Sequence, residues 1–216
     1  MWVILPGFLA GFIHVLMGPD HLAAISPLAV ENKNKSWWIG LKWGLGHTSG
    51  VLIVGIFVFL FRELIPIDIV SAFSERIVGI VLIGIGIWGL QSIFRKNIYS
   101  HKHEGIKHFH LHSHNNFTKQ KHFHTQTALY IGIIHGLAGS SHLLGVLPAL
   151  ALPTKAQAVM YLIAFGIGTI LAMIFFSQVL GIVALKFAER SLNLYRNLSV
   201  SLSSIAIAVG IFWLLY

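Results

Sequence analysis

The chain has 216 residues, of which 56% are hydrophobic and only 10% are charged, and its mean hydropathy is +0.77. This composition excludes a protein whose whole surface faces water and indicates that lipid is its solvent. The net charge of +8 would suggest a nucleic-acid partner in a soluble protein, but here the basic residues lie between apolar segments, so no nucleic acid is expected.

Six segments are long and apolar enough to cross a bilayer, whose core of about 30 Å needs ~20 helical residues. They are residues 2–30, 37–61, 72–94, 128–152, 157–186 and 197–216. Runs such as 77–90 and 156–185 are apolar on every face, unlike the alternating strands of a β-barrel. The sequence therefore predicts an all-α integral membrane protein with six transmembrane helices. The first segment has no basic leader or cleavage site, so we expect it to be retained.

The first span contains three ionisable side chains, His14, Asp20 and His21, each of which costs a few kcal/mol in lipid. On an unbroken helix the two histidines would share a face but stand about 10 Å apart. Gly18 and Pro19 predict a break, because proline lacks an N–H and glycine accepts unusual dihedral angles. Unwinding at this point would bring the three side chains toward one ion.

The second span adds His47, while Lys42 lies about two turns inside it and is expected to extend its amine to the headgroups. Imidazole nitrogens together with a carboxylate suit borderline divalent ions such as Ni²⁺, Co²⁺ and Zn²⁺. Calcium or magnesium would require more oxygen ligands. The first two spans therefore predict a transition-metal site.

Residues 95–127 form a polar segment between the third and fourth spans. We expect a largely disordered cytoplasmic linker with an auxiliary role in metal binding, because unstructured histidine runs bind metals. Its eight histidines are His101, His103, His108, His110, His112, His114, His122 and His124. The linker divides the chain into two three-helix repeats, residues 1–94 and 128–216.

The two halves resemble each other, since residues 11–22 align with residues 132–143 at an offset of 121. In this alignment His135 and His142 match the first-span histidines, and Gly139 matches the glycine of the break. Ser140 and Ser141 stand where the first half has Pro19-Asp20, so the site should be asymmetric. An odd number of spans per repeat predicts two inverted repeats, with the first helix of each kinked or broken and one site near the midplane.

His135 and His142 have two interpretations. They can be metal ligands together with His14, Asp20, His21 and His47, or they can form hydrogen bonds between helices at the repeat interface.

The orientation of the chain in the membrane follows from its basic residues, because eleven Lys and Arg residues fall in the loops on one side and three on the other. This bias predicts that both termini lie outside a plasma membrane and that the linker is cytoplasmic.

The segment His14–His21 resembles the histidine-x5-aspartate-histidine signature of hydrogenase- and urease-associated permeases in the nickel/cobalt transporter superfamily. Residues 45–49, Leu-Gly-His-Thr-Ser, resemble a further motif of that superfamily, and residues 165–169 are similar to a motif of urease-accessory-type transmembrane proteins. Val15 stands where the hydrogenase-associated branch usually has proline, so the branch stays open. The resemblance implies a nickel or cobalt carrier whose metal-handling residues are His14, Asp20, His21 and His47.

We therefore expect a secondary carrier of Ni²⁺, or else Co²⁺, that is not an enzyme and holds no resident cofactor. The chain has no nucleotide-binding signature. Transport should weaken at low pH, because protons compete with the ion for imidazole.

Two alternatives stay open. The protein can be an exporter rather than an importer, or it can be an accessory factor that delivers nickel to urease or hydrogenase maturation without transport. Partners would be a nickel metallochaperone or a second copy of the chain. Electron transfer through paired cysteines is excluded, because the chain has none.

Overall fold

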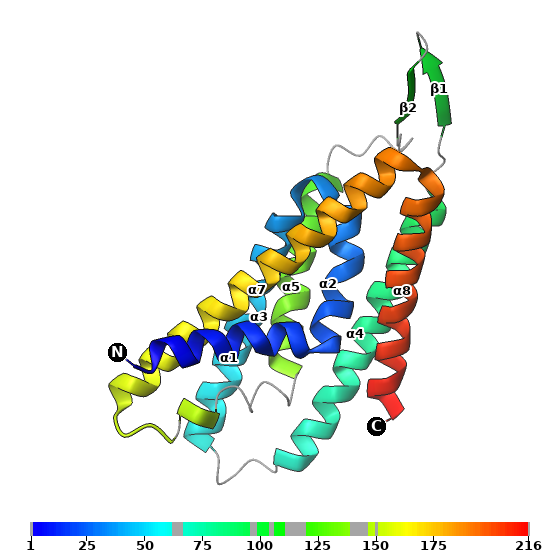
Figure 1. Ribbon diagram of the computed structural model, residues 1–216. Coiled ribbons are helices and arrows are strands. Elements are labelled where there is room, and N and C mark those ends of the chain that lie inside the picture. Colours follow the sequence, from blue (N-terminus) through cyan, green and yellow to red (C-terminus); the bar gives the residue numbers. More distant parts are fainter. Residues whose placement is uncertain are drawn as a thin grey trace.

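The computed structural model describes residues 2–61, 67–95, 99–103, 106–110, 120–138, 147–149 and 151–215 (Figure 1). Apart from one small hairpin, the regular structure is helical, as the sequence predicts. The elements are α1 (Ile4–Met17), α2 (Pro19–Glu31), η1 (Lys33–Lys35), α3 (Ser36–Phe61), α4 (Ile67–Arg95), β1 (Tyr99–His103), β2 (Ile106–His110), α5 (Gln120–Ala138), α7 (Lys155–Arg190) and α8 (Leu192–Leu215).

Four of the described helices, α3, α4, α7 and α8, contain a segment long and apolar enough to cross a membrane. The bent pair α1 and α2 makes a fifth span if the two helices are counted together. The all-α, multi-span class is thereby confirmed. The expected fourth span, residues 128–152, is described only to Ala138 and at 147–149 and 151–152, so a sixth crossing stays a prediction.

The break in the first span lies at Gly18, where α1 and α2 meet at an angle of 71°. The Gly18 N–H closes α1 by donating to the carbonyl oxygens of His14 and Val15. Pro19 then begins α2, a position at which the missing N–H of proline costs nothing. The predicted break is therefore confirmed. The expectation that glycine supplies an unusual dihedral angle is wrong, because φ −82° and ψ 103° are ordinary extended values.

The helices pack in pairs that join the two halves of the chain. Helix α1 lies against α7, α3 contacts both α5 and α7, and α4 runs beside α8 (Figure 1). The largest core cluster includes Ile25, Trp43, Leu82 and Met173, which come from four different helices. Many large apolar side chains remain exposed, such as Ile80, Ile163 and Phe212, as expected of surfaces that face acyl chains.

Close contacts of glycine with neighbouring helices recur in both halves. A Cβ added to any of four glycines would collide with the backbone of the facing helix, in the pairs Gly11–Phe165, Gly132–Trp43, Gly168–Phe8 and Gly46–Leu129. The contacts correspond between the halves at an offset of 121 or 122 residues. Gly11 and Phe165 correspond to Gly132 and Trp43, and Gly168 and Phe8 correspond to Gly46 and Leu129. Small residues permit such close helix packing in membranes. Equivalent contacts are what a two-fold related pair of repeats would produce.

The segment predicted as a linker contains the antiparallel hairpin of β1 and β2, in which His101 pairs with His108. In Figure 1 the hairpin extends away from the helices. His122 and His124 belong to the beginning of α5, whereas His112 and His114 lie outside the described residues. The disorder of the segment and the boundaries of the two repeats stay predictions.

Candidate metal centre

Four histidines and one carboxylate from separate parts of the chain meet between the helices. His14 comes from α1, Asp20 and His21 from α2, His47 from α3 and His135 from α5. His21 and His47 are 0% exposed, His135 is 1% exposed and Asp20 is 4% exposed. Only His14 is partly exposed. Five of the six predicted ligands are thus brought together, and the sixth, His142, lies outside the described residues.

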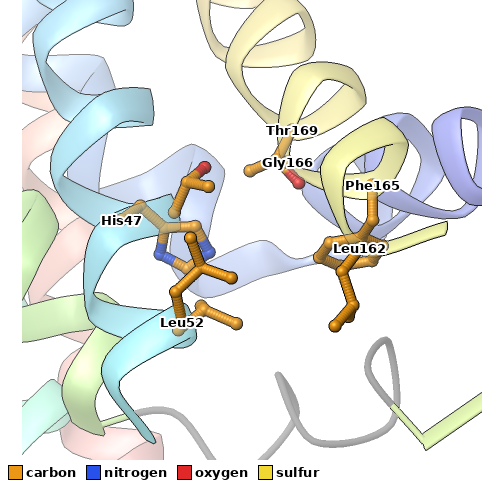
Figure 2. A pocket seen from close by; sticks show the side chains of 8 residues that line it. His47, Leu52, Leu162, Phe165, Gly166 and Thr169 are labelled. Atoms are coloured by element: carbon orange, nitrogen blue, oxygen red, sulfur yellow. The ribbon is translucent and has the colours of Figure 1, made fainter. Parts of the chain in front are cut away.

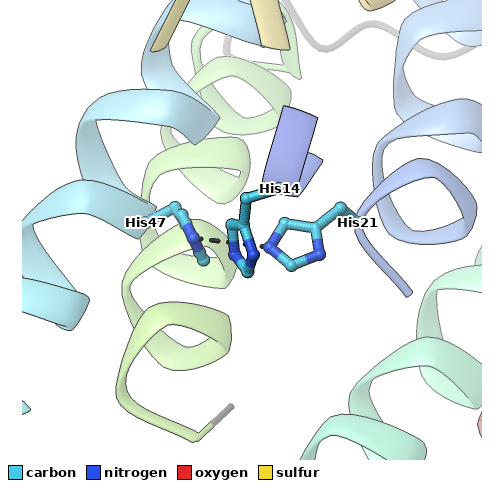
Figure 3. A group of neighbouring side chains, drawn as sticks. All are labelled: His14, His21 and His47. Atoms are coloured by element: carbon cyan, nitrogen blue, oxygen red, sulfur yellow. Dashed lines mark hydrogen bonds between the residues drawn. The ribbon is translucent and has the colours of Figure 1, made fainter. Parts of the chain in front are cut away.

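Three of the imidazoles form one group, consisting of His14, His21 and His47 (Figure 3). One ring nitrogen from each lies within 4.8 Å of the others. The Nε2 atoms of His21 and His47 are 3.4 Å apart and form a hydrogen bond. The ring centroids of His14 and His21 are 4.7 Å apart, although seven positions separate the two residues in sequence. The helix break brings these two rings together.

Asp20, His21 and His135 form a second group within the same 4.8 Å limit. The Nδ1 atom of His21 lies 3.0 Å from Asp20 Oδ1 and donates a hydrogen bond to it. The Nε2 atom of His135 lies 3.3 Å from the other carboxylate oxygen, Oδ2. Asp20 is the one acid that is buried among the described residues, and both of its carboxylate oxygens face histidines. This contact joins α5 to α2, and whether His135 serves as a ligand or as an interhelical hydrogen-bonding residue stays a prediction.

The local sequence explains why Asp20 and His21 lie where they do. Both are in the first turn of α2, where the unpaired N–H groups of the helix favour a negative side chain such as Asp20. A Cβ on Gly18 would collide with the His21 ring and lie 3.0 Å from Asp20 Oδ1. Glycine at this position therefore leaves room for these two side chains. Gly139, its match in the second half, lies outside the described residues.

The close packing of α3 and α5 positions His47 and His135. A Cβ on Gly136 would collide with the backbone of His47, and the two imidazole centroids are 5.7 Å apart. The glycines are spaced as Gly46-x3-Gly50 on α3 and Gly132-x3-Gly136 on α5. Sequence reasoning missed this interface, although the glycine-x3-glycine spacing is a recognised signal of close helix contact in membranes.

A small pocket adjoins the cluster on the side of His47 (Figure 2). In the view of Figure 2, His47 stands on one side and Leu162 and Phe165 stand on the other. The pocket is lined by His47, Thr48, Val51, Leu52, Leu162, Phe165, Gly166 and Thr169. Thr48 Oγ1 is buried and has no hydrogen-bond partner among the described residues. The sequence singled out the motifs around 47 and 167 but did not predict a pocket between them.

The distances between potential ligand atoms suit a transition metal. Metal–nitrogen bonds of about 2.0–2.1 Å place neighbouring ligands roughly 2.9–3.4 Å apart in octahedral or tetrahedral geometry. The closest approaches in the cluster, 3.0, 3.3 and 3.4 Å, fall in this range. Nitrogen with one carboxylate is also a donor set that favours nickel, cobalt or zinc over calcium or magnesium. The remaining potential ligand atoms of each group lie within 4.8 Å of one another, so binding of an ion would draw them closer.

Sequence comparison relates the chain to known membrane proteins. The family described as "Cytochrome C biogenesis protein transmembrane region" matches residues 3–209. "Urease accessory protein UreH" of Bacillus sp. (strain TB-90) is 36% identical over 179 residues, which are 82% of this chain and 75% of UreH. The likeness to UreH agrees with the resemblance of residues 165–169 to a motif of urease-accessory-type transmembrane proteins. Membership of the nickel/cobalt transporter superfamily stays a prediction.

Two proteins of Arabidopsis thaliana are also similar, "Chloroplast protein FOR GROWTH AND FERTILITY 2" and "Chloroplast protein FOR GROWTH AND FERTILITY 1". They are 32% and 31% identical over 210 and 217 residues, and each match covers 95% of this chain. The matches cover 54% and 56% of those proteins, so the chain spans about half of their length. No solved structure matches the chain significantly.

Proposed function

The chain belongs to the cytochrome C biogenesis protein transmembrane region family, and we propose that it carries a divalent transition metal ion across a membrane. The cargo is Ni²⁺, or else Co²⁺, and the buried cluster of His14, Asp20, His21, His47 and His135 binds it. The likeness to a urease accessory protein supports nickel in particular, because urease is a nickel enzyme.

One observation carries this proposal, the convergence of four imidazoles and a carboxylate in the interior of a membrane protein. Polar side chains in such an interior cost free energy unless they are paired or serve a function. Four separate helices contribute to the cluster, so simple pairing between two neighbours does not account for it. Binding of an ion does account for it, because imidazole nitrogens and a carboxylate oxygen are ligands of divalent transition metals.

Family membership does not by itself give the chemistry, because one fold hosts several functions. The name of the family refers to cytochrome c biogenesis, yet this chain contains no cysteine. A thiol–disulfide relay is therefore impossible within these 216 residues. Histidine and aspartate are the reactive side chains at its centre, and both favour metal binding.

Transport would be secondary and would alternate access by rocking one three-helix repeat against the other around the cluster. The positive-inside bias supports outside termini and a cytoplasmic linker in a plasma membrane. His101, His103, His108 and the other linker histidines would buffer the ion on that side as an auxiliary site.

The name of UreH favours a second candidate function, delivery of nickel to urease maturation without transport. In that case a metallochaperone would bind the linker stably and purified protein would move no ion. Deletion of the gene separates the remaining alternatives, since loss of an importer lowers cellular nickel and loss of an exporter raises it.

The direct test is Ni²⁺ flux into proteoliposomes containing the full chain or the variants His14→Ala, Asp20→Asn and His21→Ala. We expect at least about a tenfold loss of flux for His21→Ala, because the His21 ring belongs to both ligand groups. Tyr195→Phe is the matched control, since it removes a buried hydroxyl that contacts the Val30 carbonyl oxygen at 3.4 Å, away from the cluster. Wild-type flux in all three cluster variants would refute the site.

A further inference from the structure

We infer that the cluster contains two alternative ion positions that share His21, so that an ion crosses the cluster by moving from one edge of this imidazole to the other. This inference rests on the proposed function and deepens it. Position one is formed by His14, His21 and His47, and position two by Asp20, His21 and His135. His21 is the one residue common to both positions.

The two nitrogens of His21 face different groups. Its Nε2 atom lies 3.4 Å from His47 Nε2, in position one. Its Nδ1 atom lies 3.0 Å from Asp20 Oδ1, in position two. Because these nitrogens are on opposite edges of the ring, one ion cannot bind both. His21 therefore separates the two positions and also connects them.

The positions should exclude one another, because a neutral imidazole has one unprotonated nitrogen available to a metal. With an ion at position one, His21 Nδ1 keeps its proton and donates to Asp20. With an ion at position two, Nε2 carries the proton and donates to His47. Transfer of the ion thus releases one proton from Nδ1 and takes up one at Nε2.

The surroundings of the two positions differ. His47, a member of position one, also lines the pocket with Thr48 and Phe165, and the ring centroids of His14 and Phe165 are 5.7 Å apart. Position one includes the partly exposed His14, whereas all three residues of position two are buried, and the Trp43 ring lies 5.8 Å from the His135 ring. The ion would therefore exchange with the pocket at position one and reach position two only through His21.

The test uses Co²⁺ as a spectroscopic probe, because its visible absorption reports the number and type of ligands. All proteins are the full chain with the eight linker histidines replaced by glutamine, so that the linker contributes no signal. The variants are His47→Ala, which impairs position one, His135→Ala, which impairs position two, and His21→Ala, which impairs both. Tyr195→Phe is the control. Co²⁺ titration in detergent and Ni²⁺ flux in proteoliposomes are measured for each.

We expect one Co²⁺ per wild-type chain. His47→Ala and His135→Ala should each still bind one Co²⁺, with spectra that differ from each other, and each should lose flux. Because the observed affinity of two alternative positions is the sum of both, at least one of these variants should bind within about twofold of wild type. His21→Ala should bind none. A single site would instead give the same loss of binding in both single variants, and two ions per wild-type chain would also overturn the inference. After either of these results, Ni²⁺ flux by the wild-type protein would still support the proposed function. Absence of both Co²⁺ binding and Ni²⁺ flux in the wild-type protein would refute the proposed function and the inference together.

Discussion

The two halves of this protein share their helix packing but differ in the side chains at the centre. Gly46 of α3 contacts α5 as Gly168 of α7 contacts α1, and the offset between these glycines is 122 residues. One position further on, the first half has His47 and the second has Thr169, whose hydroxyl donates to the Gly11 carbonyl oxygen at 3.4 Å. Sequence alignment likewise sets Asp20 against Ser141. The scaffold repeats, while the ligands are concentrated in the first half.

Helix packing and metal chemistry therefore place separate requirements on the residues of this fold. Close helix contacts need only small residues, so both halves retain them. A cation site needs one set of ligands of fixed number and kind, and a symmetric pair of sites is not required for transport.

The largest effect is expected from Gly46→Leu and Gly168→Leu, because any side chain at either position collides with the backbone of the facing helix. Overpacking of this kind should cost about 3 kcal/mol or more, equally in the two variants. Thermal unfolding in detergent measures the loss. A large loss in one variant and none in the other would contradict equivalent packing of the halves.

His47→Thr makes the first half resemble the second and should weaken Ni²⁺ binding by about tenfold to a hundredfold, because one ligand is lost. The reciprocal control is Thr169→Val, which removes a hydrogen bond worth about 1 kcal/mol of stability but no predicted ligand. Calorimetric titration separates the two effects. Equal Ni²⁺ affinity in both variants would mean that the chemistry is as symmetric as the scaffold.

Asp20→Asn retains an oxygen that accepts the His21 Nδ1 hydrogen bond but removes the negative charge next to the ion. We expect Ni²⁺ binding to fall about tenfold, at the lower limit for groups that orient metal ligands. Ser141→Ala, the aligned position, should leave binding unchanged. The same titration checks both, and a comparable loss in Ser141→Ala would assign the second half a ligand role.

The smallest effect is expected from Gly84→Ala on α4, where an added Cβ meets nothing within 4 Å. Alanine is a better helix former than glycine, so stability should rise by about 0.5–1 kcal/mol. Gly86→Ala on the same helix is the matched variant, because its Cβ would lie 2.6 Å from the Ser203 carbonyl oxygen and should destabilise. Thermal unfolding of the pair tests whether close contact alone explains the glycines between α4 and α8.

Much of the fold was predictable because its signals are local. Apolar segments of sufficient length mark the helices, and Gly18-Pro19 marks the break, since proline begins a helix more readily than it continues one. The alignment of residues 11–22 with 132–143 related His14 and His21 to His135 and His142, and the cost of an acid in lipid singled out Asp20. His142 lies outside the described residues. The structure brings His14, Asp20, His21 and His135 together with His47, and their role as metal ligands stays a prediction.

The sequence by itself thus determined the solvent, the class of fold, the position of the break and the kinds of polar side chain available at the centre. Only the tertiary structure decided which atoms face one another, such as His135 Nε2 toward Asp20 Oδ2 and the two edges of His21 toward different groups. It also decided the pocket between α3 and α7. The physical reason is that hydrophobicity and helix breaks act within a segment, whereas the rotation of each helix depends on close contacts with residues more than a hundred positions away, as at Gly11 and Phe165.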